Sequence, residues 1–151
     1  MAEKKRAATN GQKTSDIFSE EEKAAMREAV RERRARAGKS KLTGEEEVLA
    51  KISEMKGSDH VIGERLHALI KTTAPELATR TWYGMPAYTK GDDVLCWFTP
   101  AAKFKARYAT FSFSDEAKLD EGRMWPISFA ITELNPAEEA KIVALLKKAL
   151  S

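Results

Sequence analysis

Residues suited to binding an anion gather within one stretch of this sequence, between positions 82 and 107. Three cations there occur at every second position, and this spacing would place them on one face of a β-strand. Guanidinium and ammonium groups pair well with anions. Shortly before them, aromatic and apolar residues surround a glycine, as in the walls of ligand pockets. The predicted site contains Trp82, Tyr83, Met85, Pro86, Tyr88, Lys103, Lys105 and Arg107.

Such a site predicts a binding module for a small anionic ligand or a peptide. The alternative is that the aromatic residues only fill the core between sheet and helices, with Gly84, Met85 and Pro86 forming a structural kink. Gly84 permits backbone conformations that other residues avoid, and Pro86 favours an extended residue before it. An exposed Trp82 or Tyr83 ring beside a cavity would favour binding, whereas a fully buried pair without a cavity would exclude it.

Catalytic residues are not predicted. The sequence contains no glycine-rich phosphate loop, nucleophile elbow or metalloprotease-type histidine pair. The single cysteine, Cys96, lies in an apolar run, which is typical of an inert core thiol. His60 and His67 fall about 10 Å apart along one expected helix, too far to ligate one metal ion, and both should face solvent or the helix flank. We expect a non-enzymatic protein with no metal site and no cofactor.

Charge is distributed unevenly along the chain. Residues 1–41 hold 12 Lys+Arg against 7 Asp+Glu, whereas residues 42–151 hold 14 against 16. The second part therefore has no charge-based reason to bind nucleic acid. The basic segment Arg31–Lys41, together with the cations at 103–107, gives another hypothesis, an adaptor that contacts nucleic acid or an acidic partner. A solvated helix with Glu–Arg pairs explains the same segment without any partner.

The chain is predicted to have three parts. Residues 1–18 are mostly small and polar, and they are expected to form a disordered tail. Residues 19–41 are expected to form a charged surface helix and a linker, and the sequence leaves open whether this helix docks. Residues 42–151 are expected to form one domain. Without a long apolar run or a secretory signal, the protein is expected in the cytoplasm, with no membrane contact. The oligomeric state stays open.

The domain is predicted to have the α+β fold class, with a mostly antiparallel sheet of four or five strands packed by N-terminal helices and a C-terminal helix. Two amphipathic helices should precede Pro75, and Asn135 should open the last helix. The strand at 94–98 is apolar throughout and should be central. The longest strand is expected at 103–114, a short helical turn at 115–120, and the last strand at 127–134.

The run Trp82-Tyr83-Gly84-Met85-Pro86-Ala87-Tyr88, just after a helix that ends near Leu77, resembles the YdhG-like family, a bacterial group largely without assigned function. The hairpin before the apolar strand at 94–98 and the strand ending in Phe113 fit as well. The resemblance covers about residues 43–150 and implies the same α+β fold.

The resemblance also implies one biochemical activity, because a member has been proposed as a frataxin-like iron chaperone. An iron-binding, chaperone-like protein is therefore a further alternative. Such a mechanism needs a ridge of exposed carboxylates. The acidic triplets at 20–22 and 45–47 begin expected helices, where acids also complement the helix dipole. Clustered carboxylates without histidine or cysteine are weak grounds for a metal site.

Overall fold

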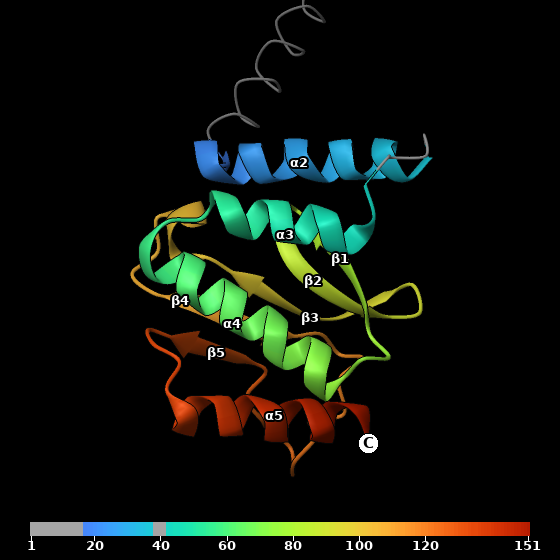
Figure 1. Ribbon diagram of the computed structural model, residues 1–151, viewed down its shortest axis with the longest axis vertical. Helices are drawn as coiled ribbons and strands as arrows, with labels where there is room; N and C mark the ends of the chain where they lie inside the picture. The colour runs from blue at the N-terminus through green and yellow to red at the C-terminus, as the bar shows by residue number, and fades with distance from the viewer. Residues whose placement is uncertain (1–16, 38–41) are drawn as a thin grey trace, which may run out of the picture.

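The computed structural model describes residues 17–37 and 42–151 (Figure 1), so most of the expected tail and part of the linker lie outside the described residues. It confirms the α+β fold class. The elements in chain order are α2 (Glu20–Ala37), α3 (Gly44–Glu54), α4 (Gly57–Thr73), β1 (Ala78–Trp82), β2 (Met85–Lys90), β3 (Asp93–Thr99), the 3-10 helix η1 (Ala101–Phe104), β4 (Ala109–Phe113), β5 (Ser128–Ile131) and α5 (Pro136–Leu150).

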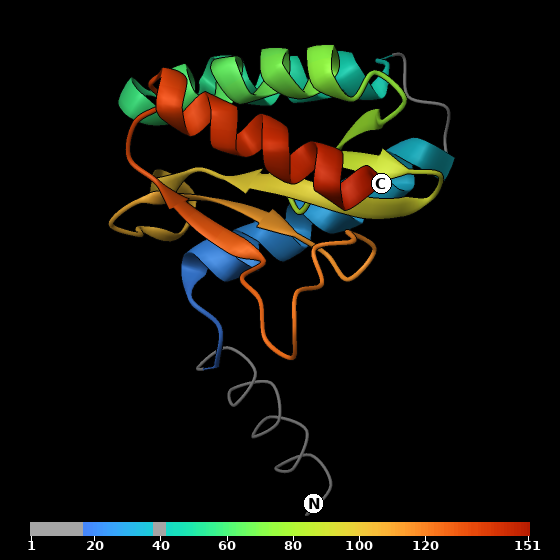
Figure 2. The same ribbon diagram turned by 90° about the horizontal axis from the view of Figure 1, so that it is seen from below.

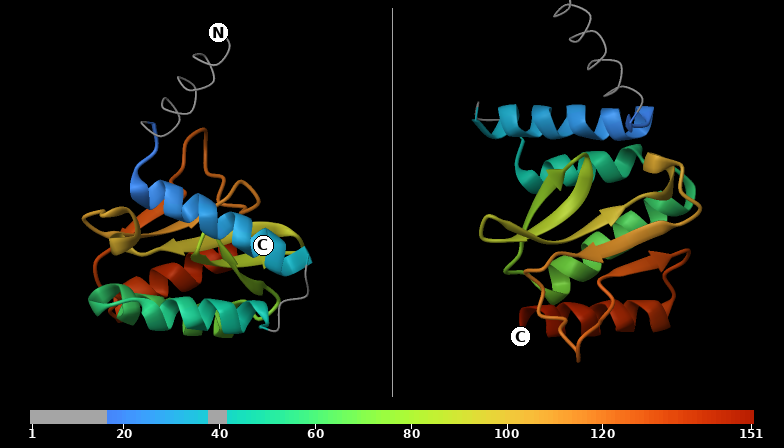
Figure 3. Two further views of the ribbon diagram at one scale, coloured as in Figure 1. Left: turned by 90° about the horizontal axis from the view of Figure 1, so that it is seen from above. Right: turned by 180° about the vertical axis from the view of Figure 1, so that it is seen from behind.

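The five strands form one antiparallel sheet in the order β1-β2-β3-β4-β5, in which each strand pairs with the next along the chain. The apolar strand β3 is central, as predicted. Helices α3, α4 and α5 lie on one side of the sheet, and α2 lies on the other side (Figure 2). The view from behind shows the strands and the position of α2 beyond α3 (Figure 3, right).

The core lies between the sheet and helices α4 and α5. Alternation along the strands puts Phe98, Phe111 and Phe113 on the face that meets these helices. Opposite them pack Leu66 of α4 and Leu146 of α5, both fully buried. Within the described ranges, no residue of α2 belongs to this cluster. The domain therefore has a core that does not depend on α2.

The predicted strand at 103–114 is wrong in its first half. Pro100 precedes η1, and the buried Asp59 carboxylate accepts the N–H groups of Ala101 and Ala102 at 2.9 and 3.1 Å. These contacts stabilise a helical turn where alternation alone predicted extension. Lys105 then has φ 52°, a left-handed conformation, and β4 begins only at Ala109.

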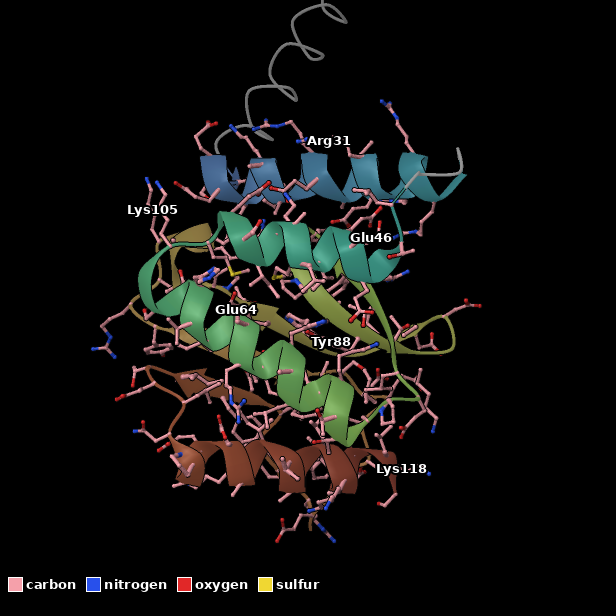
Figure 4. All side chains as sticks on the ribbon, viewed as in Figure 1. Arg31, Glu46, Glu64, Tyr88, Lys105 and Lys118 are labelled. Carbon is pink, nitrogen blue, oxygen red and sulfur yellow. The ribbon has the colours of Figure 1, made fainter. Side chains whose placement is uncertain are left out.

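The predicted solvent exposure of the histidines is wrong for His67, whose residue is only 7% exposed. Its Nδ1 lies 2.9 Å from the Tyr88 hydroxyl, and its Nε2 lies 3.1 Å from Glu45 Oε1. Glu45 belongs to α3, which packs beside α4 and covers the flank that the helical wheel left open. His60 is half-buried, with Nδ1 2.8 Å from the Ile52 carbonyl. Figure 4 labels Tyr88 beside α4.

The end of the sheet is also shorter than predicted. Residues 115–120 form turns and bends without a helix, and β5 spans only Ser128–Ile131. By contrast, α5 begins as its sequence indicated. Asn135 and Glu138 form a capping box, and Pro136 takes the first helical position.

Replacing Tyr88 with Phe tests its structural role. The change removes the hydroxyl that pairs with His67 in a buried site, so we expect the free energy of unfolding to fall by about 1–3 kcal/mol. Urea denaturation measures this change. The control is Tyr108→Phe, because Tyr108 is exposed. The free energy of unfolding of this variant should stay within about 0.5 kcal/mol of the wild-type value. Equal, small changes in both variants would contradict a stabilising role for the His67–Tyr88 contact.

Candidate anion-binding site

Helix α2 docks on the domain through small and acidic residues. Ala25 and Ala29 are 4% and 6% exposed, whereas Met26 and Val30, the large apolar side chains of this helix, are 37% and 42% exposed. The acids Glu21, Glu28 and Glu32 recur with Ala25 at helical spacing and meet the domain. The opposite face carries arginines, and Figure 4 shows Arg31 on the outer side. Helix α2 therefore docks on the domain, which the sequence alone did not decide.

The turn between β1 and β2 binds one of these acids. Tyr83 and Gly84 both have left-handed backbones, with φ 51° and 77°, as in the two-residue turns of hairpins. Their consecutive N–H groups point the same way and donate to Glu32 Oε2 and Oε1 at 3.0 and 2.8 Å. Successive N–H groups in such a turn form an anion-binding concavity. The φ of 77° favours glycine at residue 84, and a Cβ there would also force the Glu28 carboxylate to move.

Two lysines extend this turn into a carboxylate cradle, which we define as the N–H groups of Tyr83 and Gly84 with Lys51 and Lys103. Lys103 Nζ lies 3.5 Å from Glu28 Oε1. Lys51 Nζ lies 3.2 Å from Glu28 Oε2, an ion pair without the alignment of a hydrogen bond. The cradle therefore holds two carboxylates that are one helical turn apart on α2.

Lys105 adds a contact near the start of α2, where Figure 4 shows it beside the helix. Its Nζ lies 2.8 Å from Glu21 Oε1. The hydrogen bond from Lys105 is the largest cause of a lowered pKa for Glu21. The pair therefore supports docking above the ordinary pKa of a glutamate, and this support is lost as the pH falls through the lowered pKa.

A hollow of about 190 Å³ lies beside the cradle, between α2 and β1, and we call it the arginine cleft. Its cations are Arg33 and Arg36 of α2 and Arg80 of β1. The lining residues are Ala29, Glu32, Arg33, Arg36, Arg80, Trp82 and Tyr83.

Electrostatics in the arginine cleft favour an anion. Arg80 Nε is buried and has no hydrogen-bond partner among the described residues. Burial, and then the positive charge of Arg36, lower the pKa of Arg80, whereas the negative charges of Glu32 and Asp92 act in the opposite direction. The Glu32 carboxylate lines the cleft, and its two oxygens accept the N–H groups of the turn. An anion between the arginines would relieve their repulsion and supply the missing acceptor.

Aromatic rings wall the arginine cleft. The Trp82 and Tyr83 rings meet edge to face, with centroids 5.0 Å apart. Trp82 also meets Trp97 of β3 at 5.0 Å, on the sheet face away from the core. Tyr83 is exposed and Trp82 is half-buried, so ring surface does lie beside a cavity.

The eight predicted site residues do not share one surface. Trp82 and Tyr83 line the arginine cleft, and Lys103 belongs to the cradle. The other five lie elsewhere: Met85, Pro86 and Tyr88 are buried in β2, Lys105 pairs with Glu21, and Arg107 lies 5.5 Å from the Tyr108 ring centroid.

Sequence reasoning missed the three arginines of the cleft as a set. The segment Arg31–Lys41 predicts only a contact with nucleic acid or an acidic partner, and no pattern in the sequence analysis singles out Arg80. Its position two residues before Trp82 in a strand was the available signal, because residues at that spacing share a face.

The described part of the chain also bears on whether the protein has a metal site, a reactive cysteine or a membrane-spanning helix. Within residues 17–37 and 42–151, no group of three or more His, Cys, Asp or Glu residues is placed to hold a metal ion. Cys96 is buried, and burial raises the pKa of its thiol. None of the described helices is long and apolar enough to cross a membrane.

In comparisons with known proteins, no family model, curated protein or solved structure matches this chain. The resemblance to the YdhG-like family remains a prediction from the sequence.

Replacing Gly84 with Ala tests whether the turn holds α2. The added Cβ would push the Glu28 carboxylate and the Lys103 ammonium group aside, so α2 should be held less tightly and its arginines should be cleaved faster by trypsin. The control is Gly91→Ala, at φ 62° with no atom within 4 Å of the new Cβ. Both variants carry backbone strain of about 1–2 kcal/mol, but only Gly84→Ala adds the overlap. Equal cleavage of α2 in both variants would contradict docking through this turn.

Proposed function

We propose that this protein is a non-enzymatic binding module for a small anionic ligand, bound in the arginine cleft. The carrying observation is the convergence of Arg33, Arg36 and Arg80 on a hollow walled by Trp82 and Tyr83. None of the ion pairs found between described residues involves one of these arginines, although the negative charges of Glu32 and Asp92 act on Arg80. The proposal keeps the ligand class predicted from the sequence and moves its cations from 103–107 to the cleft.

The chemistry of the cleft favours an oxyanion of small size. A guanidinium group presents a planar fork of donors that matches phosphate or carboxylate in two-point contacts. Three guanidinium groups suit a doubly charged group better than a single carboxylate. At about 190 Å³ the hollow is smaller than a typical drug-sized site of roughly 300–1,000 Å³. It would accept a phosphate group with a few further atoms against the Trp82 ring.

A second candidate function, supported by the outer face of α2, is contact with nucleic acid or an acidic partner. A shallow hollow of about 370 Å³ on that face is lined by Met26, Arg27, Val30, Arg31 and Arg34. The inward acids of α2 meet the domain, so the outward arginines dominate the charge of this face. Binding here would fall steeply with salt.

Calorimetric titration with pyrophosphate tests the first candidate. We expect saturable binding to the wild-type chain. Arg80→Gln and Arg36→Gln should each weaken it about tenfold or more, because a hydrogen bond to a charged group contributes about 1.5–3 kcal/mol. The control is Arg34→Gln, on the same helix but outside the cleft, which should bind as the wild type does.

Two results would contradict the cleft as the binding site. One is the absence of saturable binding at low salt, where attraction is strongest. The other is an equal loss in Arg34→Gln and Arg36→Gln, which would indicate general attraction to a basic helix. Oligonucleotide binding that is lost in Arg34→Gln and kept in Arg80→Gln would support the second candidate instead.

A further inference from the structure

We propose that the carboxylate cradle is a docking site for an acidic helical segment of a partner protein, and that α2 is its exchangeable occupant. The partner segment would carry two acidic side chains one helical turn apart. This inference concerns the cradle and does not depend on a ligand in the arginine cleft.

The cradle recognises a pair of carboxylates rather than a single one. Lys51 and Lys103 contact the first, on Glu28, and the N–H groups of Tyr83 and Gly84 bind the second, on Glu32. Residues four apart lie on the same face of a helix, so one acidic helix satisfies both positions together. A free carboxylate or a small anion would satisfy only one of them.

The backbones that carry the donors of the cradle are positioned by the domain and not by α2. The turn is closed by the pairing of Trp82 with Met85, and Asp59 caps η1 just before Lys103. Lys51 belongs to α3, whose Val48 and Ile52 are buried. These supports remain when α2 leaves, so the turn and the backbones that carry the two lysines stay formed for another acidic helix.

Helix α2 is held mainly by polar contacts. Among the described residues of α2, Ala25 and Ala29 are the only buried apolar side chains, and a methyl group contributes little. Lys105, which pairs with Glu21, is largely exposed, and exposed ion pairs contribute little to stability. Elements held in this way belong to the least stable part of a structure and open first.

A tethered helix is hard to replace with an identical free one. Only six residues separate α2 from α3, so the tether gives α2 a high effective concentration at the cradle. A second copy of this chain offers the same helix without that advantage. The occupant that displaces α2 should therefore be a different acidic helix with a stronger hold, which points to a partner protein.

The test uses the full chain with Glu28→Gln and Glu32→Gln, which weakens the resident contacts. The probe is a fluorescein-labelled peptide with the sequence of residues 17–37, followed by fluorescence anisotropy. We expect the peptide to bind this variant at least about tenfold more tightly than it binds the wild type, because the wild-type cradle is occupied. The same peptide carrying both substitutions should lose about tenfold or more in affinity.

Glu20→Gln with Glu22→Gln is the matched control protein, since both acids are exposed on α2 and lie outside the cradle. It should bind the peptide as weakly as the wild type does. Thermal melting of every variant checks that the core is intact. If the double cradle variant does not fold, Glu32→Gln alone should give the same order of affinities.

Three outcomes would overturn the proposal. Equal peptide binding by the wild type and the cradle variant would mean that α2 does not occupy the binding site. Equal binding of the native and the substituted peptide would mean that the carboxylates are not recognised. A wild-type dimer in sedimentation, with a monomeric cradle variant, would identify a second copy of α2 as the occupant instead of a partner protein.

Discussion

The Glu32 carboxylate, bound to two consecutive backbone N–H groups of the β1–β2 turn, is the contact on which both candidate sites depend. It requires left-handed backbones at Tyr83 and Gly84, and Gly84 also leaves room for Glu28. Because this contact lies inside α2, it also fixes the register of the helix. Arg33 and Arg36 follow Glu32 by one and four residues, and they reach the cleft only in that register.

The two sites are therefore coupled through α2. A ligand in the arginine cleft contacts Arg33 and Arg36, so it would stabilise the docked helix and keep the cradle occupied. An acidic partner in the cradle would remove α2 and carry two of the three arginines away from Arg80. Each ligand would lower the affinity of the other by the same factor, since coupling between binding sites is reciprocal. The docked and released positions of α2 are the two states that this coupling requires.

Local sequence signals predicted the fold well, because its elements are short and sequentially paired. The capping boxes at Thr43 and Asn135 mark helix starts, and the turn at Gly91 joins two neighbouring strands. The errors arise where distant residues decide the local structure. Asp59 lies more than forty residues before the helical turn that it caps, and Glu45 covers His67 from another helix. Alternation and helical wheels contain no information about such neighbours.

The candidate site was only partly predictable for a related reason. Apolar periodicity would have placed Met26 and Val30 against the domain, yet both face outward while acids and alanines face inward. Hydrophobic patterning identifies docking faces when burial of apolar surface drives the contact. Here the carboxylates of α2 bind lysines and backbone N–H groups of the domain. These groups belong to three separate elements, namely α3, the β1–β2 turn and η1. A helix docked in this way is bound through specific pairs, and each pair contributes only the difference between the contact with the domain and the contact with water that it replaces. That combination suits a segment that must recognise one surface and still be able to leave it.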